Sequence, residues 1–264
     1  MNAYLALTKL NGSARESELK RAILQKDQKR TLYSDVIQKY NGIWKQDSQK
    51  EWYSHTFEQY YKGLEALGSE SYDCNLVSIS PLTLGQGQPS VLETHLTLHP
   101  IYGIPYLPGT AIKGTAAHYC HSFLGKQDEN YLLGGSYYNL LFGTTDQAGK
   151  IHYYDALVTP DKVGGALELD VLTPHHQAYN QIVVGQGSAG AESAPHDDDS
   201  PVPVHFLNIR GDFKLHLSYH GTGEQARKWL EIAAEIVTAA LGQEGLGGKT
   251  NAGYGRLRSG ERRG

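Results

Sequence analysis

The sequence predicts an α+β fold in which helices cover one face of an antiparallel sheet. Strand-like and helical segments mix without the regular alternation that builds a parallel sheet. From residue 71 they come in the order strand, helix, strands, helix, strand, which is the order of a ferredoxin-like unit. The first 70 residues are helical in pattern. We therefore expect an N-terminal helical extension over 1–70 and a ferredoxin-like domain over 71–264.

Two helices are expected in the extension. The first covers residues 13–40, begins with a capping box at 13–16 and ends at the Asn-Gly pair 41–42. The second follows a capping box at 48–51 and carries aromatic and apolar residues at helical spacing over 53–64.

The remaining elements are read from the alternation of apolar and polar residues and from turn residues. In chain order, we expect strands over 72–84 and 91–99, a turn over 105–109, a helix over 110–124, strands over 149–159 and 167–172, a flexible loop over 185–200, a strand over 206–219, a helix capped by 222–225, and a final strand beginning at 254–257.

A glycine-rich run near the C-terminus is the most informative segment. Six of the fourteen residues from Gly242 to Gly255 are glycine. Glycine adopts positive φ freely and lets another backbone approach closely, but it costs folding entropy. Cationic, hydrogen-bonding and aromatic side chains are interleaved with the glycines, namely Lys249, Thr250, Asn251, Tyr254 and Arg256. This mixture suits contact with nucleic-acid phosphates and bases.

Two other interpretations apply to this run. A nucleotide-binding P-loop needs a glycine five residues before Gly248, where this chain has Gln243. A P-loop also leads from a strand into a helix, whereas this run follows a helix. A plain glycine-rich turn before a final strand remains the simpler alternative to a loop that grips a nucleic-acid backbone.

A second signal lies at residues 101–114. Pro108 and Gly109 turn the chain, and Thr110 is expected to cap the following helix. Lys113 then falls in the first helical turn, where the helix dipole favours anions. A lysine in that place is either a solvated surface residue or one that recruits an anion together with the free backbone amides.

Together these segments resemble a known family. Residues 108–114, PGTAIKG, are similar to the PGSSLKG-type motif of the RAMP superfamily of CRISPR proteins, and residues 245–255 resemble its C-terminal glycine-rich loop. Segments at 90–108, 141–156 and 169–176 occur in an order that looks like the family of the sixth Cmr subunit of the type III-B CRISPR effector complex. The resemblance covers about residues 72–258.

The resemblance implies an RRM-like ferredoxin fold in a cytoplasmic ribonucleoprotein of antiviral defense, with a non-catalytic place near the 3′ end of the guide RNA. The implied partners are guide RNA, with target RNA as a further candidate, and other Cmr subunits, especially the backbone subunit. Where family members often carry a basic residue after the Lys-Gly pair, this chain has Ala116, Ala117 and His118.

The expected RNA contacts combine both segments. The contacting residues are Lys113, Lys249, Thr250, Asn251, Tyr254 and Arg256, and the loop glycines are Gly245, Gly247, Gly248, Gly253 and Gly255.

Composition limits how such a protein works. The net charge is −4, whereas proteins that bind nucleic acid alone and non-specifically are usually basic. RNA contact must therefore come from a local patch or within an assembly. The two cysteines, Cys74 and Cys120, form no disulfide framework, which fits a reducing cytoplasm. No secretory signal is evident and no apolar run approaches the roughly 20 residues of a membrane span, so no membrane partner is expected.

Twelve histidines raise the possibility of a metal site. His118 and His121 are three residues apart on a predicted helix, with Cys120 between them. A zinc site needs a third and a fourth ligand at suitable spacing, so we expect no metal and no other cofactor.

Catalysis without metal is the alternative function. A metal-independent, guide-RNA-processing endoribonuclease would use a histidine as general base, and His152, His175 and His176 are candidates by residue type. The acidic residues 197–199 fit a solvated loop better than a cleaving aspartate. The leading expectation is a binding subunit and not an enzyme.

Overall fold

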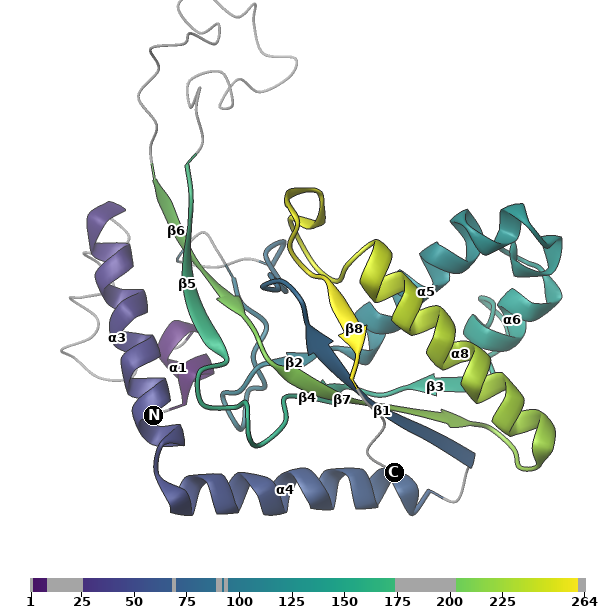
Figure 1. Cartoon of the computed structure of the whole chain (residues 1–264), viewed down its shortest axis with the longest axis horizontal. Coiled ribbons are helices and arrows are strands. Elements are labelled where there is room, and N and C mark those ends of the chain that lie inside the picture. The colour runs from purple at the N-terminus through teal and green to yellow at the C-terminus, as the bar shows by residue number, and fades with distance from the viewer. Residues whose placement is uncertain are drawn as a thin grey trace, which may run out of the picture.

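The computed structural model describes residues 2–8, 26–67, 70–88, 92, 95–173 and 203–260. Its α-helices are α1 (Ala3–Thr8), α3 (Lys26–Trp44), α4 (Asp47–Glu65), α5 (Gly109–Ser122), α6 (Ser136–Phe142) and α8 (Glu224–Gln243). Short 3₁₀ turns are η1 (Leu124–Lys126), η2 (Glu129–Tyr131) and η4 (Thr250–Ala252). The strands are β1 (Glu70–Ser78), β2 (Tyr106–Leu107), β3 (Ile151–Tyr153), β4 (Ala156–Leu157), β5 (Leu167–Leu172), β6 (Val204–Ile209), β7 (Asp212–Tyr219) and β8 (Leu257–Ser259). Figure 1 shows their arrangement.

The central sheet has the strand order β3-β7-β1-β8, and every neighbouring pair is antiparallel. Along the chain the elements of this unit come as β1, α5, β3, β7, α8 and β8. This is the ferredoxin-like order, so the predicted α+β fold with an antiparallel sheet is confirmed.

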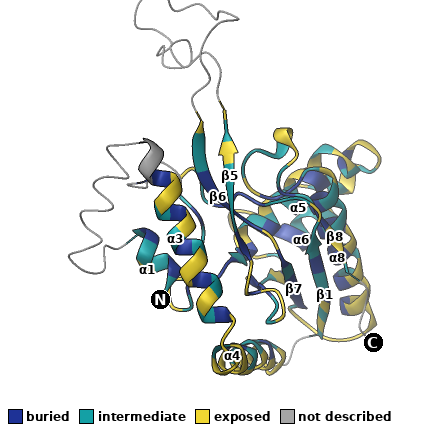
Figure 2. Ribbon diagram, turned by 60° about the vertical axis from the view of Figure 1, so that its left-hand side comes forward, coloured by how far each residue is buried: buried dark blue, intermediate teal, exposed yellow. Residues whose placement is uncertain are grey.

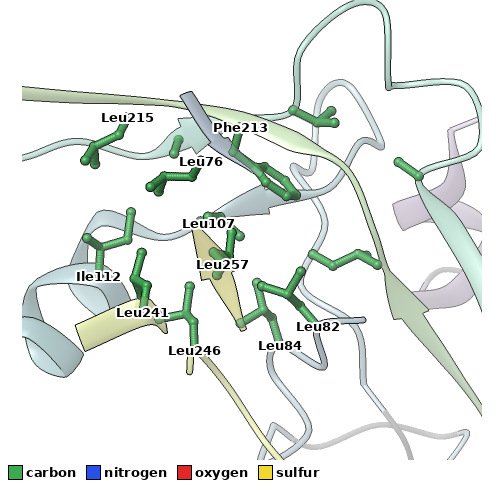
Figure 3. Packing of buried hydrophobic residues seen from close by; sticks show 14 of the residues in the cluster. Leu76, Leu82, Leu84, Leu107, Ile112, Phe213, Leu215, Leu241, Leu246 and Leu257 are labelled. Carbon is green, nitrogen blue, oxygen red and sulfur yellow. The ribbon is translucent and has the colours of Figure 1, made fainter. Parts of the chain in front are cut away.

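Helices α5 and α8 pack against one face of this sheet and form the main core there (Figure 1). Leu76 of β1 and Leu215 of β7 are fully buried on that side. Figure 3 shows them close to Ile112 of α5 and Leu241 of α8. Since alternate residues of a strand share a face, Phe213 and its neighbours two apart bury one side of β7.

Tyrosines fix α3 and α4 to the rest of the molecule. The hydroxyl of Tyr40 donates to the carbonyl of Val163 at 2.7 Å. The hydroxyl of Tyr61 on α4 donates to the carbonyl of Lys214 at 2.6 Å. The hydroxyl of Tyr53, also on α4, donates to the carbonyl of Val158 at 2.6 Å. These hydroxyls are satisfied although their rings are buried. Figure 2 shows that α3 is buried on the side toward β5 and β6 and exposed on the other.

The predicted helix boundaries in this region are partly wrong. Helix α3 runs through Asn41 and Gly42 and ends at Trp44, because the buried Trp44 and Tyr40 anchor its last turn. Tertiary packing thus overrides the low helix propensity of glycine. Helix α4 begins at Asp47 after Gln46 and has no side-chain cap, so the capping box at 48–51 is not formed. The predicted box at 13–16 lies outside the described residues.

Residues 206–219 form two strands and not one. β6 pairs with β5, whereas β7 joins the central sheet, and the chain changes sheets at Arg210 and Gly211. The β5–β6 ribbon therefore extends away from the ferredoxin-like sheet, beside the glycine-rich loop (Figure 1).

Other predicted bounds also need correction. The strand expected over 72–84 ends at Ser78, because Leu82 pairs with Ile209 and Thr83 with Gly248. The described part of 91–99 has only an isolated bridge, between Leu98 and Pro105. Residues 105–109 contain β2 and the start of α5, and 149–159 divide into β3 and β4. The residue before α8 is Gly223, without the predicted side-chain cap from 222–225. The loop at 185–200 lies outside the described residues.

Among the described helices, none combines the length and apolar character needed to cross a membrane.

Candidate nucleic-acid interface

The glycine-rich loop is anchored in the core at its centre. Leu246 is buried and lies beside Leu84 and Leu241 (Figure 3). The amide of Gly248 donates to the carbonyl of Thr83 at 2.8 Å, and the Thr83 hydroxyl donates back to the carbonyl of Gly248 at 2.6 Å. Thr83 is fully buried. The loop between α8 and β8 is therefore held in one conformation.

Two of the glycines are required by close backbone contacts. Gly247 has φ of 94°, and a Cβ there would collide with the carbonyl oxygen of Thr83. Gly255 has φ of 83°, and a Cβ there would collide with the carbonyl oxygen of Leu246. Left-handed backbone and contacts this close favour glycine.

The loop and residues 114–118 of α5 form the two walls of an open groove of about 510 Å³. Its lining residues are Gly114, Thr115 and His118 from α5, and Gln243, Glu244, Gly245, Gly247, Thr250, Asn251 and Arg256 from the end of α8 and the loop. The two sequence segments that predicted an RNA surface thus meet in space. They are more than 100 residues apart in the chain.

Five of the predicted site residues line this groove. Thr250 and Asn251 lie in η4, and Gly245 and Gly247 contribute bare backbone. The fifth, Arg256, donates from Nη1 to the carbonyl of Gly242 at 3.1 Å, so part of its guanidinium also closes the loop.

Lys249 and Tyr254 point to the β5–β6 ribbon and do not line the groove. The Lys249 Nζ lies 5.2 Å from the centre of the Phe206 ring. The Tyr254 hydroxyl donates to Oδ2 of Asp170 at 2.7 Å, and Asn208 donates to the same oxygen at 3.0 Å. Burial raises the pKa of Tyr254 to about 12, and the hydrogen bond to Asp170 adds to the rise.

Lys113 lies on α5 beside the groove but is not part of its lining. Among the described residues, its half-buried side chain forms no hydrogen bond or ion pair. The predicted cap at Thr110 is wrong. Helix α5 starts after Pro108 without a cap from its own side chains, and Oδ1 of Asp155 accepts from the Gly109 amide at 2.7 Å.

Sequence reasoning missed the acidic group of the groove. The Glu244 carboxylate accepts from Nδ1 of His118, with its oxygens at 2.9 and 3.1 Å. In the sequence, His118 stands out only as a possible metal ligand and as a departure from the family motif. Glu244 lies within the glycine-rich run, so the sequence shows its place in the loop. The sequence does not show that it pairs with His118, 126 residues away.

The P-loop interpretation does not fit this geometry. Gly248 and Lys249 lead into a three-residue 3₁₀ turn and then into β8, with no helix N-terminus to meet a phosphate.

The histidines that the sequence offered as possible metal ligands have separate partners. His118 faces Glu244, whereas Nδ1 of His121 accepts from the amide of Leu133 at 3.1 Å. Cys120 is buried, and burial raises the pKa of its thiol to about 12. Within the described ranges, no cluster of three potential metal ligands occurs. His175, His176 and residues 197–199 lie outside them.

A family model of the RAMP superfamily matches residues 75–258. The chain belongs to the RAMP superfamily. The match includes residues 75–78 of β1, the whole of α5 and the whole glycine-rich loop.

Curated relatives place this RAMP protein near the Cmr6 family. It is 27% identical over 230 residues to the CRISPR system Cmr subunit Cmr6 of Pyrococcus furiosus, over 67% of this chain and 65% of that protein. It is 25% identical over 165 residues to Cmr6 of Saccharolobus solfataricus, over 62% of this chain and 48% of that protein. The chain thus spans about two thirds and about half of the length of these two relatives.

A solved structure supports the fold of this RAMP protein. A chain in the cryo-EM structure of the type III-B Cmr-beta complex bound to cognate target RNA superposes with a TM-score of 0.59. The match is 19% identical and covers 79% of this chain and 66% of that chain.

Proposed function

We propose that this RAMP protein is a non-catalytic, RNA-binding subunit of a type III-B CRISPR (Cmr) effector complex. In this role it holds the 3′ part of the guide RNA in the groove between α5 and the glycine-rich loop. The observation that carries the proposal is the meeting of the two motifs in one groove, in a chain similar to Cmr6 proteins.

The groove suits a sugar–phosphate backbone. Gly114 and Gly247 expose main chain, which lets a backbone approach closely. Arg256 supplies a guanidinium, whose planar donors match phosphate oxygens. Thr250 and Asn251 add neutral donors. Such interactions fix the position of a nucleic acid and carry little sequence information, as a subunit that accepts many guide sequences requires.

The second group of predicted RNA-binding residues has a supporting role in this proposal. Lys249 and Tyr254 hold the loop against the β5–β6 ribbon through Phe206 and Asp170. Lys113 lies beside the groove, and its positive charge attracts the RNA backbone where the strand leaves the groove. With a net charge of −4, the protein works in a cytoplasmic assembly in which other Cmr subunits, especially the backbone subunit, supply the remaining positive field. Target RNA is reached only through its pairing with the guide.

A salt titration tests this proposal. Lys249→Ala together with Arg256→Ala is expected to weaken binding of single-stranded guide RNA. It is also expected to reduce the slope of log affinity against log salt by about 0.7 for each phosphate that the protein no longer neutralises. Fluorescence anisotropy at several salt concentrations measures both. Unchanged affinity and slope in the assembled complex would contradict the proposal.

One hydrogen bond favours the alternative of a guide-processing endoribonuclease. A carboxylate holds the exposed imidazole of His118, as an oriented general base requires. Against it, the described groove lining holds one histidine and no second one to protonate the leaving oxygen. Incubation with repeat RNA and EDTA decides between the two. We expect retention of intact RNA, and specific cleavage would overturn the non-catalytic role.

A further inference from the structure

Resting on the function proposed above, we propose that Glu244 makes the groove selective for RNA over DNA. It does so by accepting a hydrogen bond from a ribose 2′-hydroxyl.

Glu244 is held firmly at the wall of the groove. It directly follows the last residue of α8, and 19% of its side chain is exposed. The single Nδ1 of His118 lies within hydrogen-bond distance of both carboxylate oxygens. On its other side, Nε2 of His118 lies 3.3 Å from Oγ of Ser122, which fixes the ring. A carboxylate has about four acceptor positions, so one imidazole donor leaves most of them available to a ligand.

A carboxylate in this place must face a hydrogen-bond donor. The phosphates that Arg256 attracts would be repelled by Glu244 if they lay against it. Any nucleic acid in the groove therefore places its phosphates toward Arg256 and something protic toward Glu244. A neighbour without a proton to donate would leave the desolvation of the carboxylate uncompensated.

The donor is better supplied by the sugar than by a base. Bases that are turned into a protein surface usually stack on aromatic rings. No Phe, Tyr or Trp belongs to the groove lining among the described residues, and the hydroxyl of Tyr254 points to Asp170. The two lining groups on which a base could stack are already engaged: the His118 ring with Glu244 and Ser122, and the Arg256 guanidinium with the carbonyl of Gly242. The exposed main chain of Gly114 and Gly247 fits a sugar–phosphate backbone. The 2′-hydroxyl is the hydrogen-bond donor of that backbone, and DNA lacks it.

Three oligonucleotides of one sequence test this inference on the full-length chain. They are single-stranded RNA, DNA and 2′-O-methyl RNA, and fluorescence anisotropy gives each affinity. The methylated RNA keeps the ribose shape but has no proton to donate. We expect RNA to bind about tenfold more tightly than both others, as a hydrogen bond to a charged group allows.

The matching variant is Glu244→Gln, which removes the negative charge at nearly constant shape. The ratio of RNA affinity to DNA affinity is expected to decrease in Glu244→Gln, whose neutral amide oxygen is a weaker acceptor, and to approach one in Glu244→Ala, which has no acceptor. DNA is expected to bind both variants more tightly because the repulsion is gone. Glu235→Gln is the control, since Glu235 is exposed on α8, lies outside the groove lining and changes the net charge equally. Circular dichroism checks that each variant is folded. Glu244→Ala serves as a second removal of the carboxylate.

The outcomes separate the two proposals. Tight but equal binding of the three oligonucleotides overturns the role of Glu244 and leaves the RNA-binding subunit standing. A preference for RNA that survives in folded Glu244→Gln and Glu244→Ala also overturns it. Absence of binding to all three, even in the assembled complex, overturns the proposed function and this inference with it.

Discussion

Arg256 donates a hydrogen bond from Nη1 to the carbonyl oxygen of Gly242, at 3.1 Å. The two residues stand at opposite ends of the glycine-rich loop, so the arginine closes the loop that presents it. Its amide also donates to Oγ of Ser80 at 3.0 Å, next to the end of β1. A residue that the motif assigns to RNA thus has a structural task as well.

Substitution of Arg256 should separate these two tasks. Arg256→Lys keeps the charge but removes the planar donor to Gly242, so we expect a decrease of about 1 kcal/mol in the free energy of unfolding in urea. RNA affinity should fall less in this variant than in Arg256→Ala. Arg258→Ala is the control for the loss of one positive charge, because Arg258 is exposed and lies two residues further along the chain. Equal RNA affinity in the lysine and alanine variants would show that charge is irrelevant in this place.

Lys249 adopts left-handed backbone, with φ of 60° and ψ of 24°. It is the one non-glycine residue with positive φ in the part of the chain that the structure describes. Lys249→Gly and Lys249→Ala both remove the ammonium group from the Phe206 ring, but only the glycine relieves the backbone strain. We therefore expect the glycine variant to be more stable than the alanine variant by about 1 kcal/mol in urea unfolding. Equal stabilities would show that this backbone conformation is not strained.

Tyr254→Phe removes the hydrogen bond to Asp170 and should cost about 1 kcal/mol at pH 8. The pKa of Tyr254 is raised to about 12 in the folded protein, above the value of about 10 in an unfolded chain. Its neutral form is therefore favoured by folding. The stabilisation is complete below about pH 10 and is lost as the pH rises through about 12.

Urea unfolding at about pH 8 and about pH 11, on either side of the unfolded-state pKa, checks this dependence. The stability gap between wild type and Tyr254→Phe should be smaller at the higher pH. An unchanged gap would contradict the assignment of a raised pKa to Tyr254. The other tyrosines titrate in both proteins, so their contribution cancels in the difference.

Asp155 caps α5 from outside the helix, through its bond to the Gly109 amide. Asp155→Ala should destabilise the protein by about 1 kcal/mol, the usual cost when a helix cap is removed. Thermal unfolding by circular dichroism measures it. Asp161→Ala is the control, because Asp161 is exposed and has no partner in the described residues. Equal effects of the two substitutions would refute the capping role.

The order of elements and the pairing of the two motifs could be predicted from the sequence. The order depends on apolar periodicity, which each segment carries locally. The motifs meet in space because the ferredoxin-like order places α5 beside α8, and the loop directly follows α8.

The details that were predicted wrongly depend on distant residues. The end of α3 is set by burial of Trp44, and the cap of α5 comes from Asp155, 46 residues away. The hydroxyl of Tyr254 donates to Asp170, 84 residues earlier, and its contact with RNA stays a prediction. The local pattern of residues around one position does not show which distant residue will contact it. The domain division at residue 70 stays a prediction.

The groove itself is tested most directly by charge placed at Gly114. This residue lies in the groove wall on α5, and a Cβ added there meets no atom within 4 Å, so substitution leaves the fold intact. Gly63 of α4 is equally open, helical and exposed, but outside the groove, and it provides the matched control. Guide-RNA affinity of Gly114→Glu, Gly114→Ala and Gly63→Glu is the measurement. We predict an affinity about tenfold weaker for Gly114→Glu and near wild-type affinity for the other two. Equal affinities of Gly114→Glu and Gly63→Glu would contradict the assignment of this groove to RNA.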